Sequence, residues 1–280
     1  MNAWYMLTDL RDNVAEATEK RWHDNDLLRK LNFAHRMRAN ELIASPGDWL
    51  VTSEDLTPSS GVVTLPSDCL KPVYMEEIST GYPIPLTQNL RDRRTTRTSS
   101  YGLYKGYLDA YVVGNTIEIN SATYGTQVRL WYQRRVADLH CGTADTGTGA
   151  SALVLDNDME PRFEDDYYNG VYVEVIDQTS GMVDIRSLVT DYVAATETMT
   201  ITGTAAADDH YGTVLELPEE CAGLIVLEAT LLALAKPASS LDTRYFEFFE
   251  SLHRKALKDW NMFKATRVSG SNMTRVTEVY

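Results

Sequence analysis

The sequence predicts an α+β fold in which four helices, two near each end of the chain, accompany β-hairpins and an inserted small all-β domain. Apolar residues recur at spacings of three and four near both ends, and between these parts the spacing changes to two. Negative charge gathers in one stretch that follows the hairpins. The two periods predict the helices and strands, and the charge asymmetry predicts the insertion.

The longest apolar run predicts the central helix. It reads CAGLIVLEATLLALA over residues 221–235, where only Glu228 and Thr230 are polar. A helix that is apolar nearly all round must be covered on most of its circumference. A second helix is predicted after Lys236 and Pro237, with an amphipathic stripe of Leu241, Tyr245, Phe248, Leu252, Ala256, Trp260 and Phe263. Taken alone, this helical pair is typical of any helix-rich protein.

The first part of the chain predicts two further helices. One covers residues 4–18, and the other begins after Asp24 or Asn25, either of which can cap it, and ends at Ser45-Pro46-Gly47. Short strands are predicted at residues 49–52, 61–65, 73–78, 82–86 and 127–134. Gly114-Asn115 between two alternating runs indicates a hairpin.

Residues 89–100, NLRDRRTTRTSS, are polar and predict an exposed loop or short helix. Its four arginines, Arg91, Arg93, Arg94 and Arg97, could touch phosphate, but a solvated or subunit-contacting loop is the favoured interpretation.

The net charge of −14 is unevenly distributed. Between Val136 and Leu215 there are 15 acidic and 2 basic residues, a net of −13. We therefore predict an inserted acidic β domain at residues 138–212, within a discontinuous helical core at 1–137 and 213–264, and an extended C-terminal tail at 265–280. This balance argues against ordinary nucleic-acid binding, which needs a basic footprint.

The composition is that of a soluble globular protein. No apolar run reaches the length needed to span a bilayer, and we predict neither a membrane partner nor a secretory signal. Cys69, Cys141 and Cys221 are far apart, which favours reduced thiols and folding in a cytoplasm.

Motifs of catalysis are missing from the sequence, and we predict that the protein is not an enzyme, with no catalytic, cofactor-binding or metal-binding residues. The five histidines are isolated along the chain. The segment DNDME at 156–160 resembles the start of a calcium loop but lacks its central glycine and closing glutamate. A solvated acidic loop is the favoured interpretation. Glu219 and Glu220 are better explained as charges at a helix start than as glycosidase acids.

The order of parts resembles the head-to-tail adaptor proteins of tailed bacteriophages. The matching segments are HDNDLLRKLNFAHRMRANELIA, GVVTLPSDCLKPVYMEE, YVVGNTIEIN followed by VRLWYQRRV, and LPEECAGLIVLEATLLALA with its second helix. The resemblance covers about residues 1–136 and 213–264. Their order carries it, since no single motif is specific. The β insert departs from the minimal family pattern and looks like modules of several phage structural proteins.

The resemblance implies a four-helix adaptor core and a structural function in the virion. Such proteins form a ring, usually of twelve copies, in the neck below the portal, after assembly in the host cytoplasm. The implied partners are other copies of the chain, the portal protein, tail or nozzle proteins, and DNA that passes through the channel without sequence-specific binding.

Two sets of residues are expected to make these contacts. The expected core and ring-assembly residues are Leu224, Leu227, Leu231, Phe248 and Trp260. The expected portal-contact residues in the tail are Arg267, Met273, Arg275, Val276, Val279 and Tyr280.

Two other classes of protein stay open as alternatives. One is a virion decoration or carbohydrate-binding protein that stacks sugars on Tyr167, Tyr168, Tyr172 and Tyr192 of the β insert, although such tyrosines are more often core or strand residues. The other is an enzyme such as a cell-wall hydrolase, which no residue pattern supports.

Overall fold

A computed structural model describes residues 1–15, 22–45, 47–87, 109–120, 124–235 and 243–276 of the chain. The chain forms two compact units. Unit 1 comprises Met1–Glu41 and Ala137–Tyr280, and unit 2 comprises Leu42–Val136. The two units are described separately below.

The described residues are rich in β-structure, so the prediction of a four-helix adaptor core is wrong. They form four α-helices and fourteen strands in four sheets. The helices are α1 (Ala3–Asn13), α2 (Asp24–Ala44), α5 (Ala222–Leu234) and α6 (Thr243–Val276). Each unit has a cluster of buried residues among its sheets, and further buried residues such as Met6, Leu31 and Ile225 lie on the helices. The prediction failed because short strands, each a weak local signal, build cores of their own by pairing over long distances in sequence.

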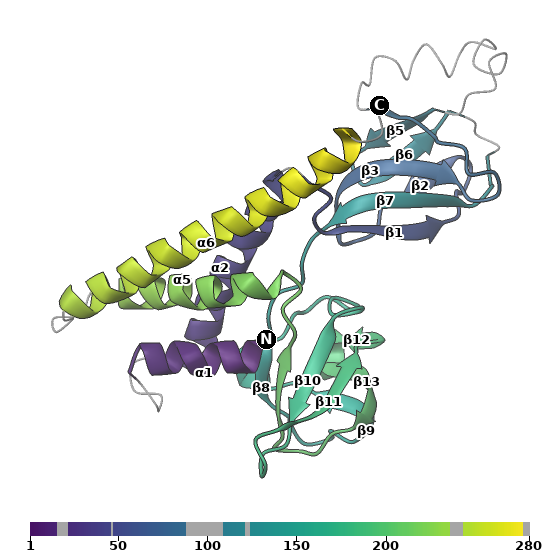
Figure 1. The fold of residues 1–280 in the computed structure, drawn as a ribbon. Helices are drawn as coiled ribbons and strands as arrows, with labels where there is room; N and C mark the ends of the chain where they lie inside the picture. Colours follow the sequence, from purple (N-terminus) through teal and green to yellow (C-terminus); the bar gives the residue numbers. More distant parts are fainter. Residues whose placement is uncertain (16–21, 46, 88–108, 121–123, 236–242, 277–280) are drawn as a thin grey trace. The chain divides into compact units, whose positions relative to one another are not determined.

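Unit 2 is built from two sheets around one core (Figure 1). Its strands are β1 (Val51–Leu56), β2 (Val62–Thr64), β3 (Cys69–Glu77), β4 (Leu86–Thr87), β5 (Ala110–Val113), β6 (Thr116–Ile119) and β7 (Val128–Arg134). One sheet has the order β1-β7-β3 and the other β2-β6-β5-β4. Gly114 has a φ of 60° at the first central position of the β5–β6 turn, as a type II′ hairpin requires.

The core of unit 2 follows from alternation along its strands. In β7, Val128, Leu130 and Tyr132 point inward, whereas Trp131 between them is exposed. The whole cluster consists of Val63, Leu65, Met75, Ile84, Ala110, Ile117, Ile119, Val128, Leu130 and Tyr132. Unit 2 is therefore stabilised by its own buried apolar surface.

The β part of unit 1 also has two sheets. Its strands are β8 (Cys141–Thr143), β9 (Ala150–Val154), β10 (Tyr172–Ile176), β11 (Val183–Leu188), β12 (Asp191–Val193), β13 (Thr198–Thr204) and β14 (His210–Thr213). The orders are β11-β10-β14-β8 and β12-β13-β9. Short 3-10 helices at Asn157–Met159, Ala194–Thr196 and Glu219–Cys221 join some of the segments. The core between the sheets includes Leu153, Tyr168, Val173, Tyr192 and Tyr211.

The helix α1 packs directly on the β part of unit 1. Asn2 caps α1 by accepting a hydrogen bond from the Tyr5 amide, and it forms a β-bridge with Val214. The Trp4 ring stacks on His210 with 4.0 Å between ring centroids. A Cβ at Gly212 would lie 2.6 Å from the backbone nitrogen of Trp4, so the close approach of α1 to β14 requires glycine at this position. The β part of unit 1 and α1 therefore pack against each other directly.

Three further helices of unit 1 pack through apolar and ionic contacts. α5 and α6 lie side by side (Figure 1), and α1 contacts α5. Ion pairs connect α2 with α5 and α6. Arg38 pairs with Glu228 of α5 at 3.2 Å, and Glu41 pairs with Lys264 of α6. No helix of the described residues is both long and apolar enough to cross a membrane.

Two boundaries differ from those expected. The helix α6 continues to Val276, so the segment predicted as an extended tail is helical up to that residue. Residues 138–212, predicted as a separate insert, lie in the same compact unit as the helices, while residues 42–136 form the other unit. Residues 138–212 are more acidic than the hairpins, as the sequence shows. Charge composition does not indicate which surfaces pack together, so it did not predict that these residues share a unit with the helices.

Candidate functional site

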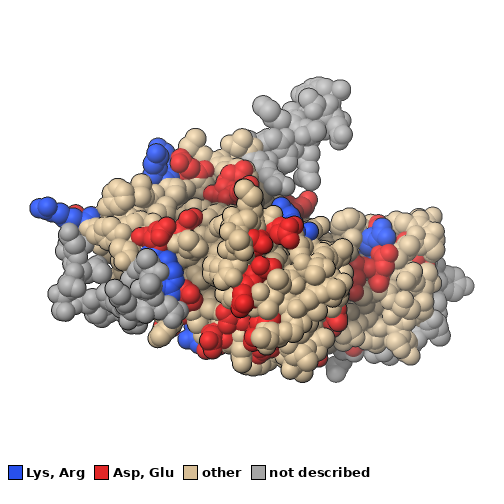
Figure 2. All heavy atoms as spheres, turned by 90° about the horizontal axis from the view of Figure 1, so that it is seen from below, with Lys and Arg blue, Asp and Glu red and all other residues tan. Residues whose placement is uncertain are grey.

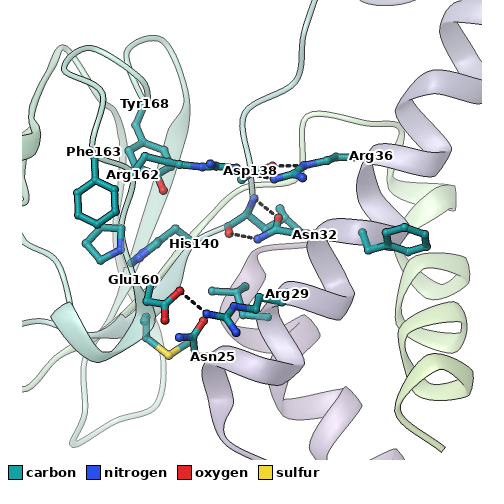
Figure 3. A pocket seen from close by; sticks show the side chains of 15 residues that line it. Asn25, Arg29, Asn32, Arg36, Asp138, His140, Glu160, Arg162, Phe163 and Tyr168 are labelled. Carbon is teal, nitrogen blue, oxygen red and sulfur yellow. Dashed lines mark hydrogen bonds and ion pairs between the residues drawn. The ribbon is translucent and has the colours of Figure 1, made fainter. Parts of the chain in front are cut away.

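A pocket of about 380 Å³ opens in unit 1 between α2 and the loop that precedes β10 (Figure 3). Charged side chains lie beside apolar ones in its wall. The lining residues are Asn25, Leu28, Arg29, Asn32, Phe33, Arg36, Asp138, Leu139, His140, Met159, Glu160, Pro161, Arg162, Phe163 and Tyr168.

Two side chains on one face of α2 hold the segment before β8 in place. Asn32 and Arg36 are four residues apart and therefore neighbours on the helix surface. Asn32 donates to the Leu139 carbonyl at 2.9 Å and accepts from the Leu139 amide at 2.7 Å. Arg36 donates twice to Asp138, from Nε at 2.7 Å and from Nη2 at 2.6 Å. This paired geometry fixes the direction in which Asp138 and His140 enter the pocket.

Asp138 is a buried carboxylate that two guanidinium groups share. Arg36 and Arg162 approach it from opposite sides, the first from α2 and the second from the loop (Figure 3). The Asp138 amide donates to the Tyr167 hydroxyl at 3.1 Å, and Arg162 lies over the Tyr167 ring. Asp138 therefore joins α2 to the loop.

A second ion pair crosses the mouth of the pocket. Arg29 Nη2 lies 2.5 Å from Glu160 Oε2, and both side chains are exposed. Hydrogen bonding to Arg29 lowers the pKa of Glu160, and the same bond raises the pKa of Arg29. Arg29 also lies 3.7 Å from Asp26, so the excess positive charge of the pocket lies at Arg36 and Arg162, which share Asp138.

His140 lines the pocket as a neutral imidazole, and its hydrogen bond with Tyr211 indicates which ring nitrogen carries the proton. The Asp156 amide donates to the Tyr211 hydroxyl at 2.8 Å, and that hydroxyl lies 3.2 Å from His140 Nδ1. Among the described residues this nitrogen is the one acceptor for the Tyr211 proton, which leaves the proton of His140 on Nε2. Burial lowers the pKa of His140 to about 3, so the ring is uncharged at neutral pH.

The Nε2 atom of His140 is a buried polar atom without a hydrogen-bond partner in the part of the chain that the structure describes. Because Nδ1 faces Tyr211, the Nε2–H group is a donor and not a base. The arrangement suits binding: it offers one fixed donor, guanidinium groups and an apolar wall.

The acidic cluster after β9 has protein partners. Asp156 caps the 3-10 helix at Asn157–Met159 by accepting from the Asp158 amide, and Glu160 pairs with Arg29. Over the described residues, no group of three or more His, Cys, Asp or Glu side chains is arranged to hold a metal ion.

The structure places the expected core residues differently. Leu224 and Trp260 are buried, Leu227 and Leu231 are half-buried, and Phe248 is 55% exposed. Phe248 therefore does not belong to the core of this chain. It lies on the outer face of α6.

The expected portal-contact residues fall at the end of the described chain. Arg267, Met273, Arg275 and Val276 lie within the last turns of α6, and their side chains are outside the described part. Val279 and Tyr280 lie outside the described residues, as do the arginines of residues 89–100.

The tyrosines proposed for sugar stacking do not share a surface. Tyr168 and Tyr192 are buried in the core with ring centroids 4.9 Å apart, whereas Tyr172 is exposed. Two of the four expected platform residues are therefore packing residues.

Sequence reasoning missed the residues that line the pocket. Asn32, Arg36, Asp138 and Arg162 come from three separate segments, and the isolated position of His140 favoured a structural role. One partial signal was available: an Asn and an Arg at a spacing of four lie on one helix face and can bind the same neighbour.

No family model matches the sequence, and a search of curated proteins finds no significant match.

Proposed function

We propose that this protein is a structural component of a tailed-phage virion that forms a ring joining the portal to the tail and extending the DNA channel. The order of segments in the sequence, which resembles the adaptor proteins, supports the proposal. The observation that carries it is the set of large apolar side chains that unit 1 leaves exposed on its helices.

These side chains form a stripe on α6. Tyr245, Phe248 and Leu252 are spaced three and four residues apart and fall on one face of the helix, and Met262 extends it. Phe248 and Met262 are 55% and 60% exposed. With 34 residues, α6 is about 50 Å long. On α2, Phe33 and Met37 are likewise exposed.

A ring explains why apolar residues on a helix remain uncovered within one chain. In a ring each copy presents one surface to the copy before it and another to the copy after it. Exposed aromatic residues on such surfaces contribute strongly to association when a neighbour buries them. We assign twelve copies, the number usual for adaptors, and a location in the virion neck after assembly in the host cytoplasm.

The proposed partners follow from this position. The portal protein lies above the ring and tail or nozzle proteins lie below it, while DNA passes through without sequence-specific contacts. The C-terminal end of α6 and the residues after it, from Arg267 to Tyr280, contact the portal in this proposal. A protein truncated after Lys264 should then fold but not co-sediment with portal.

Electron microscopy of the full chain, alone and mixed with portal, tests the proposal. We expect ring-shaped particles and a native mass that is a multiple of the 31.5 kDa chain. Phe248→Glu places a charge in the stripe and should abolish the rings while the chain stays folded. Asn261→Glu is the matched control, because Asn261 is exposed on a different face of α6 and the added charge is the same.

Two results would contradict the proposal. One is a monomer that stays monomeric in the presence of portal. The other is a normal ring from Phe248→Glu, which would remove the α6 stripe as the contact surface.

A further inference from the structure

His140 carries a hydrogen-bond donor that has no acceptor within the described residues. Its Nε2 atom is buried and has no partner among the described residues. Nδ1 faces the Tyr211 hydroxyl, and the ring stacks on Tyr211 and makes an edge contact with Tyr168. Buried polar groups in folded proteins are nearly always hydrogen-bonded. A donor that lies unpaired in the lining of a pocket therefore indicates an acceptor that enters the pocket.

The charges beside His140 indicate the sign of that acceptor. Asp138 receives two donors from Arg36 and one from Arg162, and each guanidinium group carries five. Arg29 is paired with Glu160 and with Asp26, whereas Arg36 and Arg162 share the single carboxylate of Asp138, which leaves one excess positive charge beside His140. A ligand with one negative charge balances it, whereas a cation would face the arginines.

The neighbouring surface limits the ligand to one charge. A second pocket, beyond Arg29, is lined by Asp24, Asp26, Asp156 and Asp158. These carboxylates would repel a dianion such as a phosphate monoester more strongly than a monoanion. A carboxylate, in contrast, carries the one negative charge that balances the single excess positive charge.

The apolar part of the wall indicates what the charged group is attached to. Leu28, Leu139, Met159 and Pro161 line the pocket, and Phe163, which is 89% exposed, stands at its edge. An exposed aromatic ring beside an apolar wall is suited to cover a compact apolar group. The pocket volume of about 380 Å³ accommodates one such group.

We propose that this pocket binds a ligand that carries a single carboxylate on a compact apolar group. The Nε2–H of His140 donates to one carboxylate oxygen, and the guanidinium groups of Arg162 and Arg36 supply the opposing charge. The apolar group packs on Met159, Pro161 and Phe163. This inference goes beyond the proposed ring function and does not depend on it.

The first experiment uses the unaltered full-length protein and a matched pair of probes. The pair is 3-phenylpropanoate and 3-phenylpropanamide, which share a shape and differ in charge. Calorimetry should show the acid binding about tenfold or more tightly than the amide, the factor expected for a charge-assisted hydrogen bond. In the protein with ¹⁵N-labelled histidine, the acid should shift the Nε2–H resonance of His140.

Variants then locate the site. Arg162→Gln should weaken binding of the acid about tenfold or more and leave the weak binding of the amide unchanged. Arg254→Gln is the control, since Arg254 is an exposed arginine on α6 that pairs with Glu250 far along the chain from the pocket residues. His140→Phe tests the donor itself. Should that variant fail to fold, the histidine resonance of the unaltered protein gives the same information.

A second probe pair distinguishes the carboxylate of a peptide C-terminus from that of a small molecule. N-acetyl-glycyl-phenylalanine and its C-terminal amide present the same group at the end of a peptide. Tighter binding of this acid than of 3-phenylpropanoate assigns the site to a peptide carboxylate, and the reverse assigns it to a small molecule. Equal binding of acid and amide in both pairs, or no shift of the His140 resonance at the solubility limit of the acids, overturns the inference.

Discussion

Unit 1 carries the whole net charge of the chain and all five histidines, whereas unit 2 is neutral and has no histidine. Residues 42–136 contain 9 acidic and 9 basic residues, and the remainder contains 31 acidic and 17 basic residues, a net of −14. On the face shown in Figure 2, Asp and Glu side chains are more widespread than Lys and Arg side chains. The units also differ in connectivity, because unit 2 is one continuous segment and unit 1 joins both ends of the chain.

The difference shows two ways of stabilising a fold. Unit 2 relies on one apolar core between sheets. Unit 1 adds buried titratable groups and ion pairs between distant segments, such as Arg36 with Asp138 and Arg38 with Glu228. We therefore expect unit 1 to respond to charge, pH and salt more strongly than unit 2.

The largest expected effect breaks unit 1 alone. Leu224→Asp introduces a carboxylate on a buried face of α5, where it has no partner, and should destabilise unit 1 by about 4 kcal/mol or more. Hydrogen exchange should then accelerate in α5 and β8 while protection persists in β7 of unit 2. Gly223→Asp is the control, because this neighbouring position is exposed and a Cβ there meets nothing within 4 Å. Loss of protection in both units would show that they unfold together.

The reciprocal change addresses unit 2. Leu130→Ala leaves a cavity beside Met75 and Val128 and should cost about 2–5 kcal/mol. We expect exchange to accelerate in β1, β3 and β7 but not in β10 or β14. An equal acceleration in β10 would remove the distinction between the units.

Acid should weaken unit 1 more than unit 2. Burial lowers the pKa of His35 to about 4 and that of His140 to about 3, from an ordinary value of 6.5. Because the unfolded chain binds these protons more readily, the stabilisation is complete above pH 6.5 and is lost as pH falls toward the folded values. By pH 4 the loss should be about 2–3 kcal/mol for each histidine.

A substitution at His35 isolates one of these contributions. Neither ring nitrogen of His35 has a partner among the described residues, so His35→Leu removes two unpaired polar atoms without breaking a hydrogen bond. We expect it to raise the free energy of unfolding by about 1 kcal/mol at pH 7 and to reduce the acid sensitivity. Denaturant titrations at pH 7, 5.5 and 4 measure both. An unchanged pH dependence would mean that His35 already titrates normally.

The last comparison is between an ion pair of unit 1 and an ion pair of unit 2. Asp138→Asn removes a buried charge that holds two arginines and should cost about 1–2 kcal/mol, a moderate value because both arginines are partly exposed. Asp55→Asn is the match in unit 2, where Asp55 and Arg129 form an exposed pair 2.7 Å apart, and it should cost less than about 1 kcal/mol. Equal losses would show that the junction of α2 with the loop contributes no more than a surface pair.

Several elements of this fold were predictable from local sequence. The apolar run at 221–235 located α5, and Gly114-Asn115 located the β5–β6 turn, because each signal lies within one element. The same reasoning gave the wrong fold class. It weighted long periodic helices over short strands, and it predicted an extended tail from residue 265 onward, whereas α6 continues to Val276.

The sequence by itself determined the charge asymmetry, the α5 run and the alternation of the strands, since these depend on residue type and on spacing within a few positions. The tertiary structure alone decided which strands pair, as β1 pairs with β7 across more than 70 residues, and which side chains line the pocket. Arg36 and Asp138 are 102 residues apart, and the tautomer of His140 is set by Tyr211, 71 residues away. Such contacts follow from the simultaneous burial of many surfaces, and no local pattern encodes that condition.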